Sequence, residues 1–144
     1  MKKILVVALL CVFCALLCSC ESDRVKYYKE RVSSYEEIAE YALQNYADPD
    51  GNRVVVSLSD ITDESLSQSI SVAEKRFSYI WIENNSVIFW NDEMKALGLV
   101  YSHNTKQAIK DIEEWYHGLE KEKINKNCYL IGDLYGIVER LAGF

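Results

Sequence analysis

The sequence contains two histidines, His103 and His117, and these are the first side chains to consider for catalysis or metal binding. They stand fourteen positions apart, and neither has a second His or a Cys three or four residues away. A zinc site needs three or four ligands at close spacing, so the sequence predicts no metal site. Either His could serve as a general base beside a carboxylate, and a small hydrolase built on one of them is our alternative hypothesis.

Other patterns of catalytic residues are missing from the sequence. No Ser lies in a Gly-x-Ser-x-Gly pattern, and the six Gly are scattered and form no phosphate-binding loop. The adjacent carboxylates Asp92-Glu93 and Glu113-Glu114 are typical of a turn or helix surface that faces solvent. Cys128 lies in an apolar run, so we interpret it as a buried small side chain rather than a nucleophile. We therefore assign no catalytic residue and predict no cofactor.

Aromatic side chains are the most unusual feature, with ten Tyr and three Trp, all of them after residue 20. Tyr79, Trp81, Trp90 and Tyr101 fall on three expected strands, and alternation there places apolar residues on both faces of the sheet. One interpretation is a sheet that helices cover on both sides. The other leaves part of the aromatic face open, and these four residues are then the candidate contact surface.

The N-terminus has the pattern of an export signal. Lys2 and Lys3 precede fourteen consecutive apolar residues, 4–17, and Ser19, Cys20 and a charged segment follow. A helix that spans a bilayer needs about 20 apolar residues, so a signal peptide is favoured over a spanning helix, which is the alternative.

The end of the apolar run, Leu17-Cys18-Ser19-Cys20, resembles the lipobox of bacterial lipoproteins. The resemblance covers residues 1–20 only. It implies that Cys20 receives a diacylglyceryl thioether, that the signal peptide 1–19 is removed, and that Cys20 usually gains a further acyl chain on its amine. Two or three chains attach a protein stably to the membrane without any inserted helix. The resemblance thus implies a lipid-anchored protein that faces outside the cytoplasm, and an ordinary secretory signal cut elsewhere is the alternative.

Processing of this kind changes the cysteine count and the charge. Three of the five Cys leave with the signal and Cys20 carries lipid, so Cys128 remains and no disulfide within the chain is expected. The loss of Lys2 and Lys3 changes the formal net charge from -6 to -8. We expect so acidic a domain to be repelled by an anionic membrane surface and not to bind nucleic acid.

The mature chain reads as a short tether over 20–26 followed by one α+β domain over 27–144. Apolar residues three and four apart predict helix over 28–46. A capping-box signature at Ser34 and Glu37 indicates that this helix either starts at Tyr35 or is interrupted near Ser33 and Ser34. Asp48-Pro-Asp-Gly-Asn52 predicts a plain turn, because the twelve-residue spacing of a calcium loop is missing. Further along, the pattern predicts a strand over 54–58 and a helix over 66–77, for which a strand over the Ser-rich run 65–71 is the alternative. An antiparallel meander is expected over 79–83, 86–90 and 96–102, followed by a helix over 104–118, a hairpin over 120–131 and a terminal helix over 134–143.

These observations favour a fold in which an antiparallel meander sheet packs with several amphipathic helices. The function that we expect is that of a non-enzymatic, membrane-anchored lipoprotein of the bacterial cell envelope. Its partner would be a protein or a surface polymer, and one concrete variant is an inhibitor or immunity-type factor. The alternatives are a small envelope hydrolase that uses His103 or His117, and a purely structural envelope-assembly factor.

Overall fold

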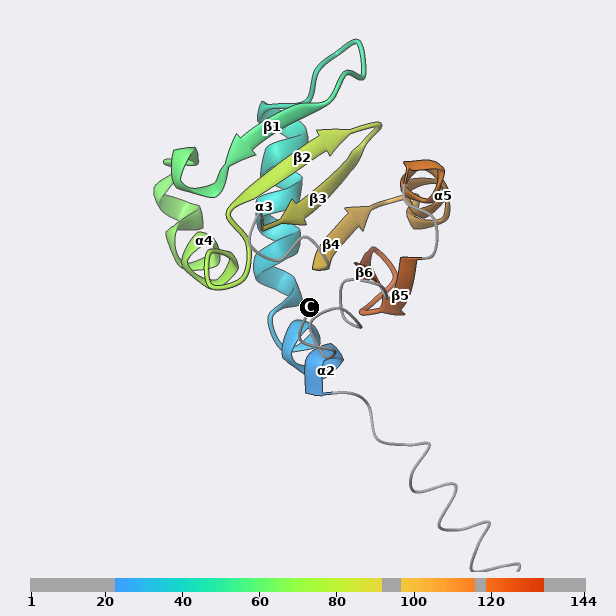
Figure 1. Ribbon diagram of the computed structural model, residues 1–144. Coiled ribbons are helices and arrows are strands. Elements are labelled where there is room, and N and C mark those ends of the chain that lie inside the picture. Colours follow the sequence, from blue (N-terminus) through green and yellow to red (C-terminus); the bar gives the residue numbers. More distant parts are fainter. Residues whose placement is uncertain (1–22, 92–96, 116–118, 134–144) are drawn as a thin grey trace, which may run out of the picture.

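Six antiparallel strands form one open sheet in the part of the chain that the structure describes, residues 23–91, 97–115 and 119–133 (Figure 1). This computed structural model confirms the predicted α+β class. The strands are β1 (Val54–Ser57), β2 (Tyr79–Glu83), β3 (Ser86–Trp90), β4 (Leu97–Ser102), β5 (Leu119–Lys123) and β6 (Cys128–Asp133). The helices are α2 (Asp23–Lys29), α3 (Val32–Asn45), α4 (Ser67–Ala73) and α5 (Thr105–Trp115), with 3-10 turns η1 (Leu58–Asp60) and η2 (Glu64–Leu66).

The strand order is β1-β2-β3-β4-β6-β5. The predicted meander is confirmed as β2-β3-β4, and its first turn consists of Asn84 and Asn85, whose φ angles of 49° and 58° suit a tight hairpin. The predicted last hairpin is confirmed as β5–β6, and it joins the sheet through β6, which pairs with β4. The two edges of the sheet are therefore β1 and β5.

Helices cover the two faces of this sheet unequally. On the first face, α2, α3 and α4 enclose a core in which Tyr35 lies edge-on to Phe77 and Phe89, at centroid distances of 5.9 and 5.4 Å. On the second face, α5 packs through Ala108 and Ile112 over the middle strands. In Figure 1, α3 lies behind β1, β2 and β3, and α5 lies to one side. No described helix lies over β1 and β2 on the second face.

The first helical stretch is interrupted, which was one of the two alternatives, but the break lies earlier than expected. A two-residue turn at Glu30 and Arg31 divides the stretch into α2 and α3, before Ser33 and Ser34. Ser34 and Glu37 do not form a capping box, because both lie inside α3, and Glu37 accepts a hydrogen bond from the Ser69 hydroxyl of α4 at 2.6 Å. Glu37, which the sequence pattern assigned to a helix cap, thus joins α3 to α4.

The expected tether over 20–26 is also too long, because α2 begins at Asp23 and buries Val25 and Tyr28. Their spacing continues the apolar stripe of α3 toward the N-terminus, although charged residues surround Val25. The helix expected over 66–77 is shorter, since α4 ends at Ala73 and a turn returns Phe77 to the core.

Several predictions fall outside the described residues: the signal peptide with Leu17, Cys18, Ser19 and Cys20, the carboxylates Asp92-Glu93, His117, the end of the helix at Gly118, and the terminal helix over 134–143. Within the described ranges, no helix combines the length and the apolar character that a bilayer-crossing segment needs.

Candidate functional site

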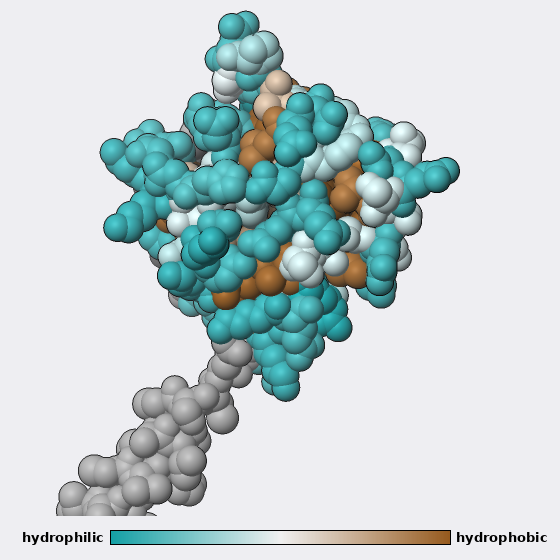
Figure 2. Space-filling model, turned by 180° about the vertical axis from the view of Figure 1, so that it is seen from behind, coloured by the Kyte–Doolittle hydropathy of each residue, from teal (hydrophilic) through white to brown (hydrophobic). Residues whose placement is uncertain are grey.

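The candidate site is the β1 side of the second face, which no described helix covers. Val55 on β1 is the large hydrophobic side chain with the greatest exposure in the described ranges, at 59%. It stands opposite Trp81 of β2, which in turn stands opposite Ile88 of β3. An apolar strip therefore runs from the edge strand toward α5. By contrast, the helical side of the molecule is mainly hydrophilic, with hydrophobic atoms in small separate patches (Figure 2).

Three aromatic rings form the centre of this strip. Tyr79 and Trp81 stack with a centroid distance of 6.2 Å and an angle of 27° between their planes. The Trp81 ring lies 5.3 Å from that of Trp90, which is the cross-strand partner of Tyr79. Such pairs stabilise a sheet by about 0.5–1.5 kcal/mol beyond the area that they bury. The rings are thus held in a fixed arrangement before any partner binds. We call Val55, Tyr79, Trp81 and Trp90 the aromatic strip.

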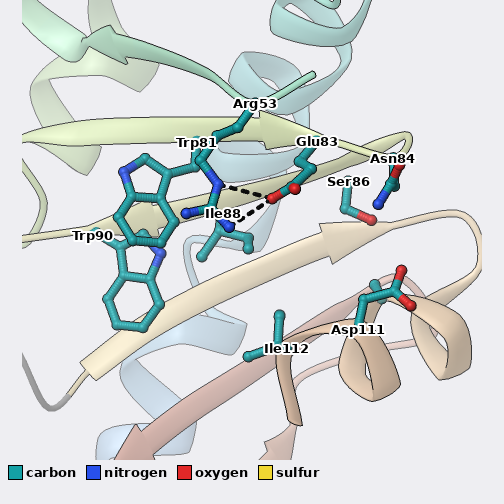
Figure 3. A pocket seen from close by; sticks show the side chains of 10 residues that line it. Arg53, Trp81, Glu83, Asn84, Ser86, Ile88, Trp90, Asp111 and Ile112 are labelled. Carbon is teal, nitrogen blue, oxygen red and sulfur yellow. Dashed lines mark hydrogen bonds and ion pairs between the residues drawn. The ribbon is translucent and has the colours of Figure 1, made fainter. Parts of the chain in front are cut away.

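A charged pair borders the aromatic strip on the β1 side. Because residues two apart on a strand share a face, Arg53 lies beside Val55 and Glu83 lies beyond Trp81. The Nε and Nη2 atoms of Arg53 both donate to Oε2 of Glu83 at 2.8 Å. The guanidinium carbon lies 4.6 Å from the centroid of the Trp81 ring, and Figure 3 shows Arg53 between Trp81 and Glu83. Trp81 therefore already binds one cation from its own chain.

Helix α5 forms the other wall of the site with Ala108, Asp111 and Ile112. Asp111 is fixed by a hydrogen bond that the Gln107 amide donates to its Oδ1 atom at 2.6 Å. The hollow between these walls has a volume of about 40 Å³, whereas sites for small-molecule ligands usually measure about 300–1,000 Å³. The arrangement suits a side chain of a macromolecular partner better than a substrate molecule.

The structure brings together three of the four predicted contact residues. Tyr79, Trp81 and Trp90 share the second face, although Trp90 is only 6% exposed and serves as a wall. The prediction for Tyr101 is wrong, because it pairs with Val87 on the first face and is buried there. Strand alternation gives faces within one strand, but the register between strands decides which faces coincide.

Sequence reasoning missed Val55, Arg53 and Glu83. The period-two pattern over 53–57 is visible in the sequence and places residues 53, 55 and 57 on one face. Nothing in that pattern says that β1 pairs with β2, and this pairing brings Arg53 to Glu83, thirty residues away.

His103, the residue of the alternative hypothesis, does lie beside a carboxylate. Its Nε2 atom is 3.1 Å from Oε1 of Glu40, and the Tyr101 hydroxyl donates to the same oxygen. Burial, and then the Glu40 carboxylate, raise the pKa of Tyr101 well above its usual range, so its hydroxyl keeps its proton. The His103 side chain is 65% exposed and lines none of the hollows described above or below. His117 lies outside the described residues.

The structure also gives the surroundings of Cys128 and of the possible metal ligands. Cys128 is buried and free, as predicted, and burial together with the nearby Glu36 carboxylate raises the pKa of its thiol to about 12. In the described ranges, no three His, Cys, Asp or Glu side chains lie close enough together to hold a metal ion. A second, open groove beside α5, of about 370 Å³, is lined by residues that include Lys106, Lys110 and Tyr129.

Comparison with known proteins gives no relative for this chain. No protein-family model, no curated protein and no solved structure matches it.

Proposed function

We propose that this chain is a non-enzymatic lipoprotein of the bacterial cell envelope, anchored through Cys20, whose aromatic strip binds a positively charged protein outside the cytoplasm. The observation that carries the proposal is the continuous apolar strip from Val55 to Trp90, which described helices leave open on the β1 side. Fixed Trp and Tyr side chains with a polar border are typical of the centres of protein interfaces.

The charge around the strip supports a basic partner. The turn that leads into β1 lies beside Glu83 and carries Asp48 and Asp50. Arg53 follows this turn, and Glu83 is its partner in an ion pair. Asp111 adds another carboxylate on the α5 side. A partner that presents Lys or Arg at this border would gain complementary charge.

The position of the strip also suits a partner that approaches from outside. The first described helix, α2, begins at Asp23, three residues after Cys20, so α2 lies near the proposed anchor. In Figure 1, α2 and β1 lie at opposite ends of the molecule, and α3 runs between them. The anchor would therefore leave the open edge of the sheet pointing away from the membrane. An inhibitor or immunity-type factor that neutralises an exported protein is a concrete form of this function.

The alternative function, a small hydrolase, is favoured by one observation, the 3.1 Å contact between His103 and Glu40. In that function His103 would act as a general base and Glu40 would orient it. Loss of a hydrolytic activity on envelope material in His103→Ala, with the fold retained, would establish it. The open position of His103 and the protonated Tyr101 beside it instead fit a surface ion pair.

The test of the proposal is a pull-down from solubilised bacterial envelopes with the full chain as bait. Trp81→Ala removes the centre of the strip, and Tyr129→Ala is the matched control, because Tyr129 is also half-buried and lies on β6 of the same sheet. We expect a basic protein that the wild type and Tyr129→Ala retain and that Trp81→Ala loses. Equal retention by all three would contradict the proposal. Loss of a carbohydrate instead of a protein would replace the protein partner with a surface polymer.

A further inference from the structure

Positive side chains gather around α2, at the end of the domain next to Cys20. Residues 23–31 carry four cations and two carboxylates. The fold adds the turn at 74–76, which contains Glu74, Lys75 and Arg76, because the Arg76 guanidinium lies 4.8 Å from the centroid of the Tyr27 ring. Arg31 lies over the same ring at 4.0 Å. The two segments together hold six cations and three carboxylates, and Glu21 and Glu122, the ion-pair partner of Arg24, raise the number of carboxylates to five.

The opposite end of the domain is acidic. The segment 46–66 around β1 has five carboxylates and one cation, which is the reverse of the balance around α2. The two ends are separated by α3, whose 14 residues span about 21 Å. The net charge of the mature chain therefore hides a strong asymmetry along the axis of α3.

Distance decides which of these charges acts on a membrane. At physiological ionic strength the Debye length is about 8 Å, so charges about 20 Å from the lipid surface are largely screened. The three residue steps from Cys20 to Asp23 span at most about 10 Å when the chain is extended. A Cys20-anchored domain would thus present the charges of α2 to the headgroups, and not its net charge.

We infer that the basic surface formed by α2 and the turn at 74–76 contacts anionic lipid headgroups and orients the domain with β1 away from the membrane. This inference rests on the proposed anchoring at Cys20, and it replaces the repulsion that net charge alone led us to expect. Arg24 and Arg31 already form ion pairs with Glu122, at 3.0 Å, and with Glu30, at 3.3 Å. Exposed Lys26 and Lys75 are therefore the side chains to test.

The experiment uses the lipidated protein purified from membranes and reconstituted into two kinds of vesicle. One kind contains equal parts of phosphatidylglycerol and phosphatidylcholine, and the other contains phosphatidylcholine alone. An amine-reactive label, read residue by residue with mass spectrometry, reports the access to each Lys. On the anionic vesicles we expect labelling of Lys26 and Lys75 to fall about three-fold or more relative to the neutral ones, and high salt to abolish the difference. Lys110 on α5 is the exposed reference that should not change.

Charge-reversal variants test whether the basic surface itself is responsible. Lys26→Glu and Lys110→Glu change the net charge equally, at exposed helix positions that lie in α2 and α5. We expect Lys26→Glu to restore labelling of Lys75 on anionic vesicles, and Lys110→Glu to leave its protection intact.

The outcomes separate this inference from the proposed function. Equal labelling of Lys26 and Lys75 on both kinds of vesicle, or protection of Lys110 in place of Lys26, would overturn the inference. If the same sample carries lipid by intact mass, the proposed anchor at Cys20 is unaffected by that result. An intact mass without lipid on the same sample would instead overturn the anchor, and with it the function proposed above.

Discussion

The buried thiol of Cys128 makes the fold sensitive to alkaline pH. Burial raises its pKa from about 9 to about 12, so the folded state keeps the proton that the unfolded chain loses above about pH 9. Below pH 8 both states are protonated and the group has no effect on stability. Above pH 9 the unfolded state binds fewer protons, and the free energy of unfolding falls until pH passes about 12.

The size of the effect follows from the two pKa values. At pH 10.5 the thiol of the unfolded chain, with a pKa of 9, is almost fully ionised, whereas the folded thiol stays protonated. This difference lowers the free energy of unfolding by about 2 kcal/mol. Tyr28 adds about 0.8 kcal/mol at the same pH, because desolvation raises its pKa from 10 to about 12. Small domains have only about 5–15 kcal/mol in total, so the loss is measurable.

Urea unfolding of the wild type and of Cys128→Ala, at pH 8 and at pH 10.5, tests this prediction. We expect the wild type to lose about 2 kcal/mol more than the variant between the two pH values, whatever constant difference the substitution itself causes. Parallel losses in the two proteins would refute the reasoning, because they would mean that the folded state does not hold the thiol in a desolvated position.

Substitutions at three further positions test the sheet and the His103 cluster. Gly98→Ala should lower the free energy of unfolding by about 1–3 kcal/mol in urea titrations, since a new Cβ would lie 3.2 Å from the Phe89 carbonyl oxygen; an unchanged midpoint would contradict this packing. Asn85→Val should cost about 1–2 kcal/mol because Asn85 has a positive φ, whereas Asn85→Gly should not destabilise; equal thermal midpoints for both variants would exclude the hairpin turn. His103→Ala should change stability by less than about 1 kcal/mol, since its pair with Glu40 is exposed, and a larger loss in denaturant would show a structural role that the geometry does not suggest.

Local patterns in the sequence were sufficient for most of the fold. The meander was predictable because 79–83 and 86–90 are β-rich and because Asn84 and Asn85 tolerate the positive φ that a tight turn needs. The last hairpin was predictable for similar reasons. Its place in the sheet was not, because the pairing of β4 with β6 joins strands about thirty residues apart, and no local pattern encodes that contact.

The candidate site was predictable only in part. Tyr79 and Trp81 could be placed together, since they lie two apart on one strand, whereas the face of Tyr101 depended on the register of β4 against β3. The basic surface was hidden for a related reason: Arg76 reaches Tyr27 only through the packing of the turn after α4. The net charge gives the balance of charged residues in the chain, and only the fold shows where on the surface they lie.

The proposed orientation and partner surface both depend on lipid attachment at Cys20, which an intact-mass measurement detects. The protein would be purified from a bacterial membrane fraction and compared with a Cys20→Ala variant. We expect the wild type to have lost residues 1–19 and gained two or three acyl chains, and the variant to have done neither. A wild-type mass that retains residues 1–19, or a protein released without lipid, would contradict the anchor and the orientation and partner surface derived from it.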